Sequence, residues 1–86
     1  MSKRTMLEIA INKVSLDATA EFTFFEIFDA VENELKSDWE ERFVTDAKPY
    51  EKVRETKMGE LHRLLTVDKR FQRTANDKWQ GKNTGF

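Results

Sequence analysis

The segment from Thr66 to Lys82 contains two short runs of side chains that alternate in direction, separated by Ala-Asn-Asp at 75–77. Alternation on both sides of such turn residues predicts a β-hairpin. A tight turn places Phe71 and Trp79 on one face of the hairpin and leaves its basic residues facing water or a partner. The rest of the chain is therefore expected to support this hairpin.

A strongly periodic helix lies just before the hairpin. A helix followed by a basic hairpin with aromatic anchors is the layout of a winged helix. Lys69, Arg73 and Lys78 are predicted to contact a partner or nucleic acid, because loops such as a wing tip often carry function. The residues predicted to anchor the wing are Asp68, Arg70, Phe71 and Trp79. Within this set, Arg70 is expected to pair with Asp68 or another nearby acid.

The length of 86 residues predicts one small domain, which buries only about 60–65% of its unfolded surface. Seven Phe and two Trp suit such an economical core. The lack of cysteine excludes disulfides and thiolate metal sites, and a reducing cytoplasm is the default location. Short apolar runs interrupted by charges predict no membrane span, and the first residues show no signal-peptide pattern.

Charge is distributed unevenly along the chain. Residues 1–47 carry 5 basic and 11 acidic side chains, whereas residues 48–86 carry 10 basic and 5 acidic ones. This asymmetry indicates a dipolar molecule whose second half could face a polyanion. Ordinary charge scatter on solvated faces is the alternative explanation.

The first helix is expected to start near Thr5 and to end between residues 16 and 18. Its predicted apolar stripe, at helical spacing, comprises Leu7, Ala10, Ile11 and Val14. Phe22 then enters a short extended stretch, where a winged helix has its first strand beside the later hairpin.

Thr23 is predicted to open the second helix, because Glu26 three residues later completes a capping box. The predicted buried face comprises Phe24, Ile27, Phe28, Val31 and Leu35. Phe25 points elsewhere and is expected at the edge of the first helix or exposed. Helical spacing favours core packing of these rings over a cofactor wall. The acids on the opposite face, which are Asp29, Glu32 and Glu34, are expected to be solvated rather than catalytic.

Ser37 is predicted to cap a third, shorter helix held to the core by Trp39 and Phe43. The chain is then expected to break between residues 46 and 49, and a last helix to run from about Pro49 to Leu65. Its predicted buried side comprises Tyr50, Val53, Met58 or the stem of Lys57, Leu61, Leu64 and Leu65. Gly59 inside this helix is interpreted as the mark of a close helix crossing.

The outer side of the last helix carries four cations, which are Lys52, Arg54, Lys57 and Arg63. A DNA-reading helix uses such cations together with Asn, Gln or Ser at base edges. Here Glu51, Glu55 and Glu60 are interleaved with them instead. This pattern weakens the hypothesis of base reading and allows ordinary surface pairs.

Catalytic and cofactor chemistry have little support in the sequence. His62 is the only histidine and has no cysteine or recognisable serine nucleophile to act with. One imidazole cannot supply the three or four N or S ligands of a zinc site. The three glycines form no phosphate-binding loop. No enzyme activity, metal or cofactor is predicted.

Three stretches resemble the N-terminal domain of the bacterial RNA polymerase delta-subunit family, within the HARE-HTH group of winged helices. They are F-T-F-F-E-I-F-D-A-V at 22–31, L-T-V-D-K-R-F at 65–71, and the Trp eight residues after that Phe. The most specific part is the spacing of Asp68, Arg70, Phe71 and Trp79. The resemblance covers about residues 6–82.

The resemblance implies a non-catalytic accessory subunit of bacterial DNA-directed RNA polymerase that docks on the core enzyme through this domain. The family's long acidic C-terminal tail does not follow Lys82, so displacement of nucleic acid by such a tail is not carried over. Lys69 stands where the family often has Gly, and the segment 38–50 is longer than the family pattern. These departures concern the wing and the third helix.

The predicted fold is a small α+β winged helix-turn-helix at residues 1–82, mostly helical with a short three-stranded antiparallel sheet, followed by a frayed tail at 83–86. The leading hypothesis is a cytoplasmic, monomeric transcription module that binds core polymerase. One alternative is a duplex DNA-binding winged helix that uses the last helix and the wing. Another is a protein-interaction domain of a different complex, in which exposed Phe25 or Trp39 marks the docking patch.

Overall fold

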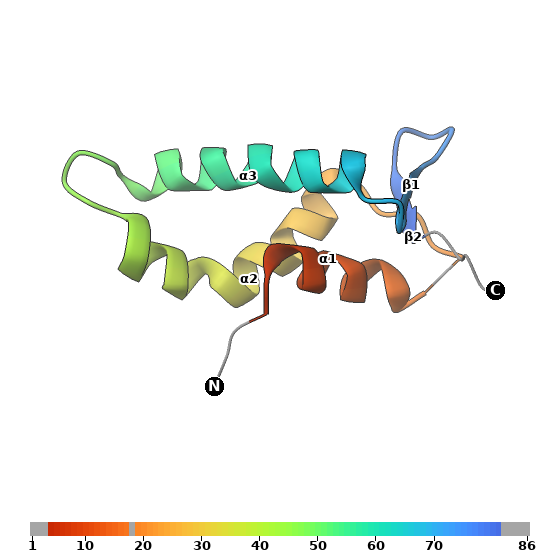
Figure 1. Ribbon diagram of the computed structural model, residues 1–86, viewed down its shortest axis with the longest axis horizontal. Coiled ribbons are helices and arrows are strands. Elements are labelled where there is room, and N and C mark those ends of the chain that lie inside the picture. Colours follow the sequence, from red (N-terminus) through yellow and green to blue (C-terminus); the bar gives the residue numbers. More distant parts are fainter. Residues whose placement is uncertain (1–3, 18, 82–86) are drawn as a thin grey trace.

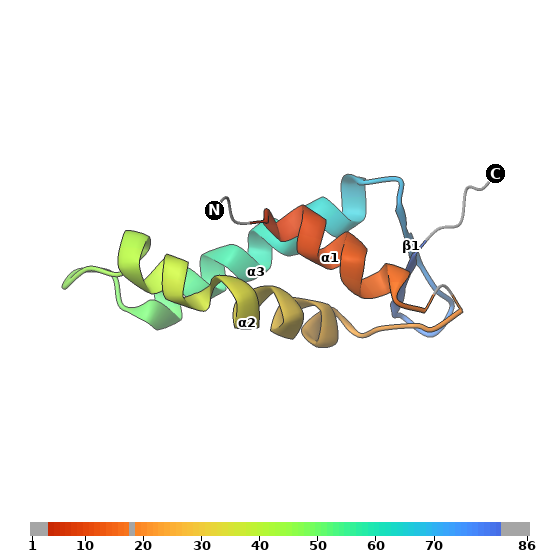
Figure 2. The ribbon, with the colours of Figure 1, turned by 90° about the horizontal axis from the view of Figure 1, so that it is seen from below.

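The computed structural model describes residues 4–17 and 19–81, which form a small, mostly helical α+β domain with extents of 47 × 30 × 18 Å. Its elements are α1 (Met6–Ser15), α2 (Phe24–Phe43), α3 (Tyr50–Val67), β1 (Phe71–Arg73) and β2 (Trp79–Gly81). The ends of α2 and α3 nearest their connecting loop extend past the start of α1 (Figures 1 and 2). No helix in the described ranges is long and apolar enough to cross a membrane.

Capping boxes start the first two helices. The predicted box at Thr23 is confirmed: Thr23 Oγ1 accepts from the Glu26 amide at 3.1 Å, and Glu26 Oε1 accepts from the Thr23 amide at 2.8 Å. Thr5 and Glu8 form the same arrangement at α1. Two otherwise orphaned amides are thereby satisfied at each start. α3 begins after its N-cap residue, Pro49, which has no side chain that can accept a hydrogen bond from the first amides of the helix.

One apolar core lies between the three helices and the hairpin. The buried apolar side chains are Met6, Ile9, Ala10, Val14, Ile27, Phe28, Val31, Leu35, Trp39, Val53, Leu61, Leu65, Phe71 and Trp79. Most of the predicted α2 face and half of the α3 face are therefore buried. The buried face of α1 differs in part from the predicted one. Ala10 and Val14 are buried as predicted, but Met6 and Ile9 complete the face, while Leu7 and Ile11 are only half-buried.

The prediction of a separate helix capped by Ser37 is wrong, because α2 continues unbroken from Phe24 to Phe43. Leu35 and Trp39, four residues apart, are both buried on one face, and Ser37 lies exposed between them. Burial of a Trp outweighs the weak preference of serine for a cap. The fold therefore has one long helix where two were predicted.

The prediction of a three-stranded sheet is also wrong. β1 and β2 pair antiparallel, and Phe22 adds a single bridge to Trp79 through two backbone hydrogen bonds of 2.7 Å. A third strand does not develop, because Thr23 caps α2 immediately after Phe22. Phe22 is nevertheless extended beside the hairpin, as predicted.

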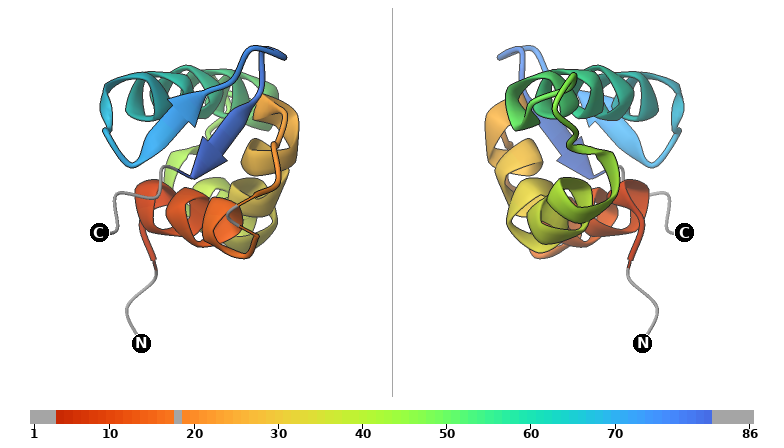
Figure 3. Two further views of the ribbon diagram at one scale, coloured as in Figure 1. Left: turned by 90° about the vertical axis from the view of Figure 1, so that its right-hand side faces the viewer. Right: turned by 90° about the vertical axis from the view of Figure 1, so that its left-hand side faces the viewer.

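The hairpin turns at residues 74–78, around the predicted turn residues. Asp77 adopts a positive φ of 64°, a conformation that Asp tolerates better than most residues. Phe71 and Trp79 are 6% and 5% exposed, so the aromatic face of the hairpin is buried. Viewed end-on, the hairpin lies across the bundle between α1 and α3 (Figure 3, left). At Gly81 a Cβ would lie only 3.2 Å from Val14 Cγ2, so the strand sits close on α1.

The interpretation of Gly59 as a close helix crossing is wrong. A Cβ built at Gly59 meets no atom within 4 Å, and the residue lies on the exposed side of α3. α3 also runs two residues beyond the predicted end at Leu65, to Val67. The predicted frayed tail at 83–86 lies outside the described residues.

Candidate docking surfaces

Two of the four predicted anchors of the hairpin, Asp68 and Arg70, bind each other. Arg70 binds Asp68 in a bidentate pair, with Nε 3.0 Å from Oδ1 and Nη2 2.8 Å from Oδ2, and its amide donates to Oδ1 at 2.9 Å. These hydrogen bonds hold the pKa of Asp68 below its usual value. The predicted Arg70–Asp68 pair thus links the end of α3 to the start of β1.

The three hairpin residues predicted to contact a partner differ in their surroundings. The Arg73 guanidinium binds Asp77 and lies 5.3 Å from the centre of the Trp79 ring. Lys78 is half-buried, and its charge contributes to lowering the pKa of Glu26. Lys69 is exposed. Much of the positive charge of the hairpin is therefore balanced by neighbouring acids.

Two of the four cations predicted on the outer side of α3 instead pack against α2. Arg54 Nε binds Glu32 Oε2 at 2.9 Å, and its guanidinium lies 5.1 Å from the centre of the Phe28 ring. The Lys57 ammonium lies 4.4 Å from the centre of the Phe43 ring, and its side chain is only 16% exposed. Lys52 and Arg63 remain exposed. The prediction of the outer side is therefore wrong for Arg54, whereas Lys57 follows the alternative prediction that its stem lies on the buried side.

A polar clamp joins α2 to α3. The Tyr50 hydroxyl donates to Glu32 Oε2 at 2.5 Å, and Arg54 donates to the same oxygen. Burial and the neighbouring Glu32 carboxylate raise the pKa of Tyr50, so the phenol stays protonated as a donor. Glu32 was predicted to be a solvated surface acid, but its side chain is 15% exposed and structural.

The most exposed aromatic ring among the described residues lies at the start of α2. Phe25 is 61% exposed and meets Phe24 edge-to-face, with ring centres 5.6 Å apart. Beside it is a depression of about 270 Å³, here called the Phe25 groove. The residues that line the groove are Phe25, Glu26, Phe28, Asp29 and Arg54. The sequence pointed to Phe25, but it gave no sign of the groove or of its acidic rim.

Trp39 is buried at 2% exposure, so its predicted role in the core is confirmed and the alternative that it marks an exposed docking patch is wrong. Its burial follows from its place on the same helical face as Leu35. Among the described residues of α2, Phe25 is the large apolar side chain that is exposed.

His62 is exposed on α3 and lies among rings rather than nucleophiles. Its ring centre lies 5.8 Å from that of Phe24 and 6.3 Å from that of Trp79. The imidazole of α3 therefore lies beside a ring of α2 and a ring of the hairpin, at the point where these three elements meet. In the described part of the chain, no three His, Cys, Asp or Glu residues are grouped to hold a metal ion.

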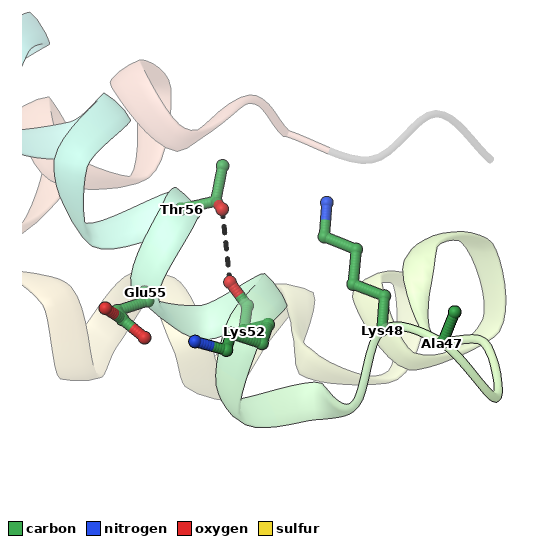
Figure 4. Close-up of a pocket in the computed structure, with 5 residues that line it drawn as sticks. All are labelled: Ala47, Lys48, Lys52, Glu55 and Thr56. Carbon is green, nitrogen blue, oxygen red and sulfur yellow. Dashed lines mark hydrogen bonds between the residues drawn. The ribbon is translucent and has the colours of Figure 1, made fainter.

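A second depression lies at the start of α3 (Figure 4). It is lined by Ala47, Lys48, Lys52, Glu55 and Thr56. The two ammonium groups point in different directions, and the Thr56 hydroxyl donates to the Lys52 carbonyl at 3.1 Å. Because the polar groups do not converge on one point, this depression has no catalytic geometry.

No family model, curated protein or solved structure matches this chain.

Proposed function

We propose that this chain is a HARE-HTH-type winged helix that docks, without catalysis, on core RNA polymerase, as a bacterial, cytoplasmic, monomeric relative of the delta-subunit domain. The element order supports this proposal: helix, extended Phe22, helix, helix and hairpin. The four residues of the most specific resemblance lie in the hairpin and just before it, where Asp68 and Arg70 pair and Phe71 and Trp79 are buried.

The observation that favours a protein partner over DNA is the surface of α3. Arg54 and Lys57 are turned into the contact with α2, and the remaining outer face mixes Lys52 and Arg63 with acids such as Glu55. A polyanion gains little at such a face, because the positive charge is diluted and partly neutralised. Polypeptide surfaces carry no comparable uniform charge.

The test is binding of the purified chain to purified core polymerase from the source organism, in nuclease-treated samples at near-physiological salt. Docking on protein predicts co-elution in size-exclusion chromatography that survives nuclease. A matched run of the chain without polymerase gives its own elution volume as the control. If the folded chain does not co-elute with the polymerase, the proposed function is wrong.

The second candidate function is contact with duplex DNA through the hairpin. It is favoured by three cations of the hairpin region: Lys69 just before β1, and Arg73 and Lys78 on either side of the turn. Phosphate contact predicts affinity that falls steeply with salt, and a shallower salt dependence when Arg73 and Lys78 are replaced by Gln. Salt-independent or undetectable DNA binding would remove this candidate.

A further inference from the structure

We propose that the Phe25 groove binds a segment of a partner polypeptide that carries Lys or Arg beside an apolar side chain. This inference goes beyond the proposed function, because it concerns the chemistry of the segment and holds for any partner protein.

The floor of the groove is aromatic. Phe28 is 1% exposed and stacks on Phe24, whose ring supports Phe25 edge-to-face. Phe25 itself extends from this support with most of its surface in water. A ring held in this way can take an apolar side chain with little loss of conformational entropy.

The rim of the groove is acidic. Glu26 and Asp29 line it, and Arg54, which lines it too, already binds Glu32. The capping box fixes the Glu26 side chain, and the hydrogen bond from the Thr23 amide lowers its pKa, with smaller contributions from the charges of Lys13 and Lys78. The Glu26 carboxylate is therefore ionised near neutral pH. A cation entering the groove meets these carboxylates and the face of Phe25 together.

The aromatic rings and carboxylates of the groove favour some classes of ligand over others. Phosphate groups of nucleic acid or of anionic lipid would meet Glu26 and Asp29, and like charges repel. The volume of about 270 Å³ lies below the range of about 300–1,000 Å³ that is typical of small-molecule sites. Side chains of a basic, apolar polypeptide segment match both the charge and the size.

The test uses the ¹⁵N-labelled full chain and two helical peptides of equal length, one with Leu and Lys at amphipathic spacing and one with Leu and Glu. We expect the Leu/Lys peptide to shift amide resonances of residues 24–29 and of Arg54 in a saturable manner. The Leu/Glu peptide should leave these resonances in place. Shifts centred elsewhere, equal shifts with both peptides, or no shifts with either would overturn the inference.

Matched variants then separate the ring from the charges. Phe25→Ser should weaken binding of the Leu/Lys peptide about tenfold, since anchors dominate small interfaces. Its control is Leu16→Ser, which removes another exposed apolar residue outside the groove. The pair Glu26→Gln and Asp29→Asn should also weaken binding, and Gln retains the cap. Its control is Glu40→Gln with Glu41→Gln, which removes two exposed acids elsewhere on α2.

Each variant is first checked for an unchanged pattern of resonances outside the groove, so that loss of binding cannot come from unfolding. Unchanged affinity in Phe25→Ser, or equal weakening in a groove variant and its control, would show that the segment binds elsewhere. The titration contains no polymerase, so its result is separate from the test of the proposed function.

Discussion

The hairpin and the Phe25 groove both combine aromatic rings with charged side chains, but they use them in opposite ways. In the hairpin, Trp79 is buried under Arg73, and Arg73 binds Asp77. In the groove, Phe25 stands in water beside carboxylates. The comparison shows that the aromatic and basic side chains of the hairpin are largely used in contacts within the domain. The exposed aromatic surface lies instead at the start of α2, where the sequence has no basic residues.

The largest expected effect is a difference in the free energy of unfolding between a substitution in the hairpin and one in the Phe25 groove. Trp79→Ala should lower the free energy of unfolding by about 3–5 kcal/mol, because it leaves a cavity under the hairpin. Phe25→Ala should change it by no more than about 0.5 kcal/mol, since that ring is mostly exposed. Urea denaturation followed by circular dichroism measures both. Comparable losses in the two variants would mean that Phe25 also belongs to the core.

A smaller loss of stability is expected when the polar clamp between α2 and α3 is removed. This clamp shares Arg54 with the Phe25 groove. Glu32→Ala should cost about 1–3 kcal/mol, because it deprives the Tyr50 hydroxyl and Arg54 of their shared acceptor. It should also free the Arg54 cation and so weaken binding of the Leu/Lys peptide. Denaturation and the peptide titration measure these effects. Glu41→Ala, at an exposed position of the same helix, is the control, and an equal loss there would contradict a structural role for Glu32.

A change in stability of intermediate size is expected for a substitution on the exposed side of α3. Gly59→Ala should stabilise the chain by up to about 1 kcal/mol, because Ala favours a helix and its Cβ meets no atom within 4 Å. Thermal denaturation measures the gain. If docking on the polymerase uses only the groove, this variant binds as the parent chain does. Destabilisation would mean that the surroundings of Gly59 are more crowded than the structure shows.

The smallest expected effect is the pH dependence of stability. It tests two ion pairs, Arg70–Asp68 beside the hairpin and Arg4–Glu34 between the start of the chain and α2. The pKa of Asp68 is lowered by Arg70, and the pKa of Glu34 is lowered by Arg4, so both carboxylates favour the folded state when ionised. This stabilisation is present above the unfolded pKa values, which are 3.8 for Asp68 and 4.5 for Glu34, and is lost as the pH falls through the lower folded pKa values. Melting temperatures measured down the acid range should therefore decline below about pH 4.5.

The control is Asp68→Asn, whose melting temperature should fall less steeply in acid than that of the parent chain. An identical acid dependence in both would show that the Arg70–Asp68 pair contributes nothing to stability, which is a common outcome for exposed pairs.

Local chemistry made several parts of the fold predictable. The capping box at Thr23 depends on residues three apart, and the hairpin on turn residues flanked by alternating side chains. Each of these signals lies within a short window of sequence. Ser37 shows the limit of such signals, because the burial of Trp39 decided that the helix continues.

The candidate site was predictable only in part. Helical spacing separated Phe25 from the buried face, and the structure confirms its exposure. The same spacing could not show that Arg54 meets Glu32, 22 residues earlier in the chain. It also could not show that Lys57 covers Phe43 rather than pointing to solvent.

The sequence by itself determined where α1 and α2 begin, where the hairpin turns and which aromatic residues can anchor it, because these outcomes depend on bonds between near neighbours. Only the tertiary structure decided that α2 is one long helix, that two cations of α3 pack against α2, and that Phe25 lies beside a depression lined by Glu26 and Asp29. Those outcomes arise where α2 and α3 pack side by side, and the free energy of such contacts exceeds the local preferences of single residues.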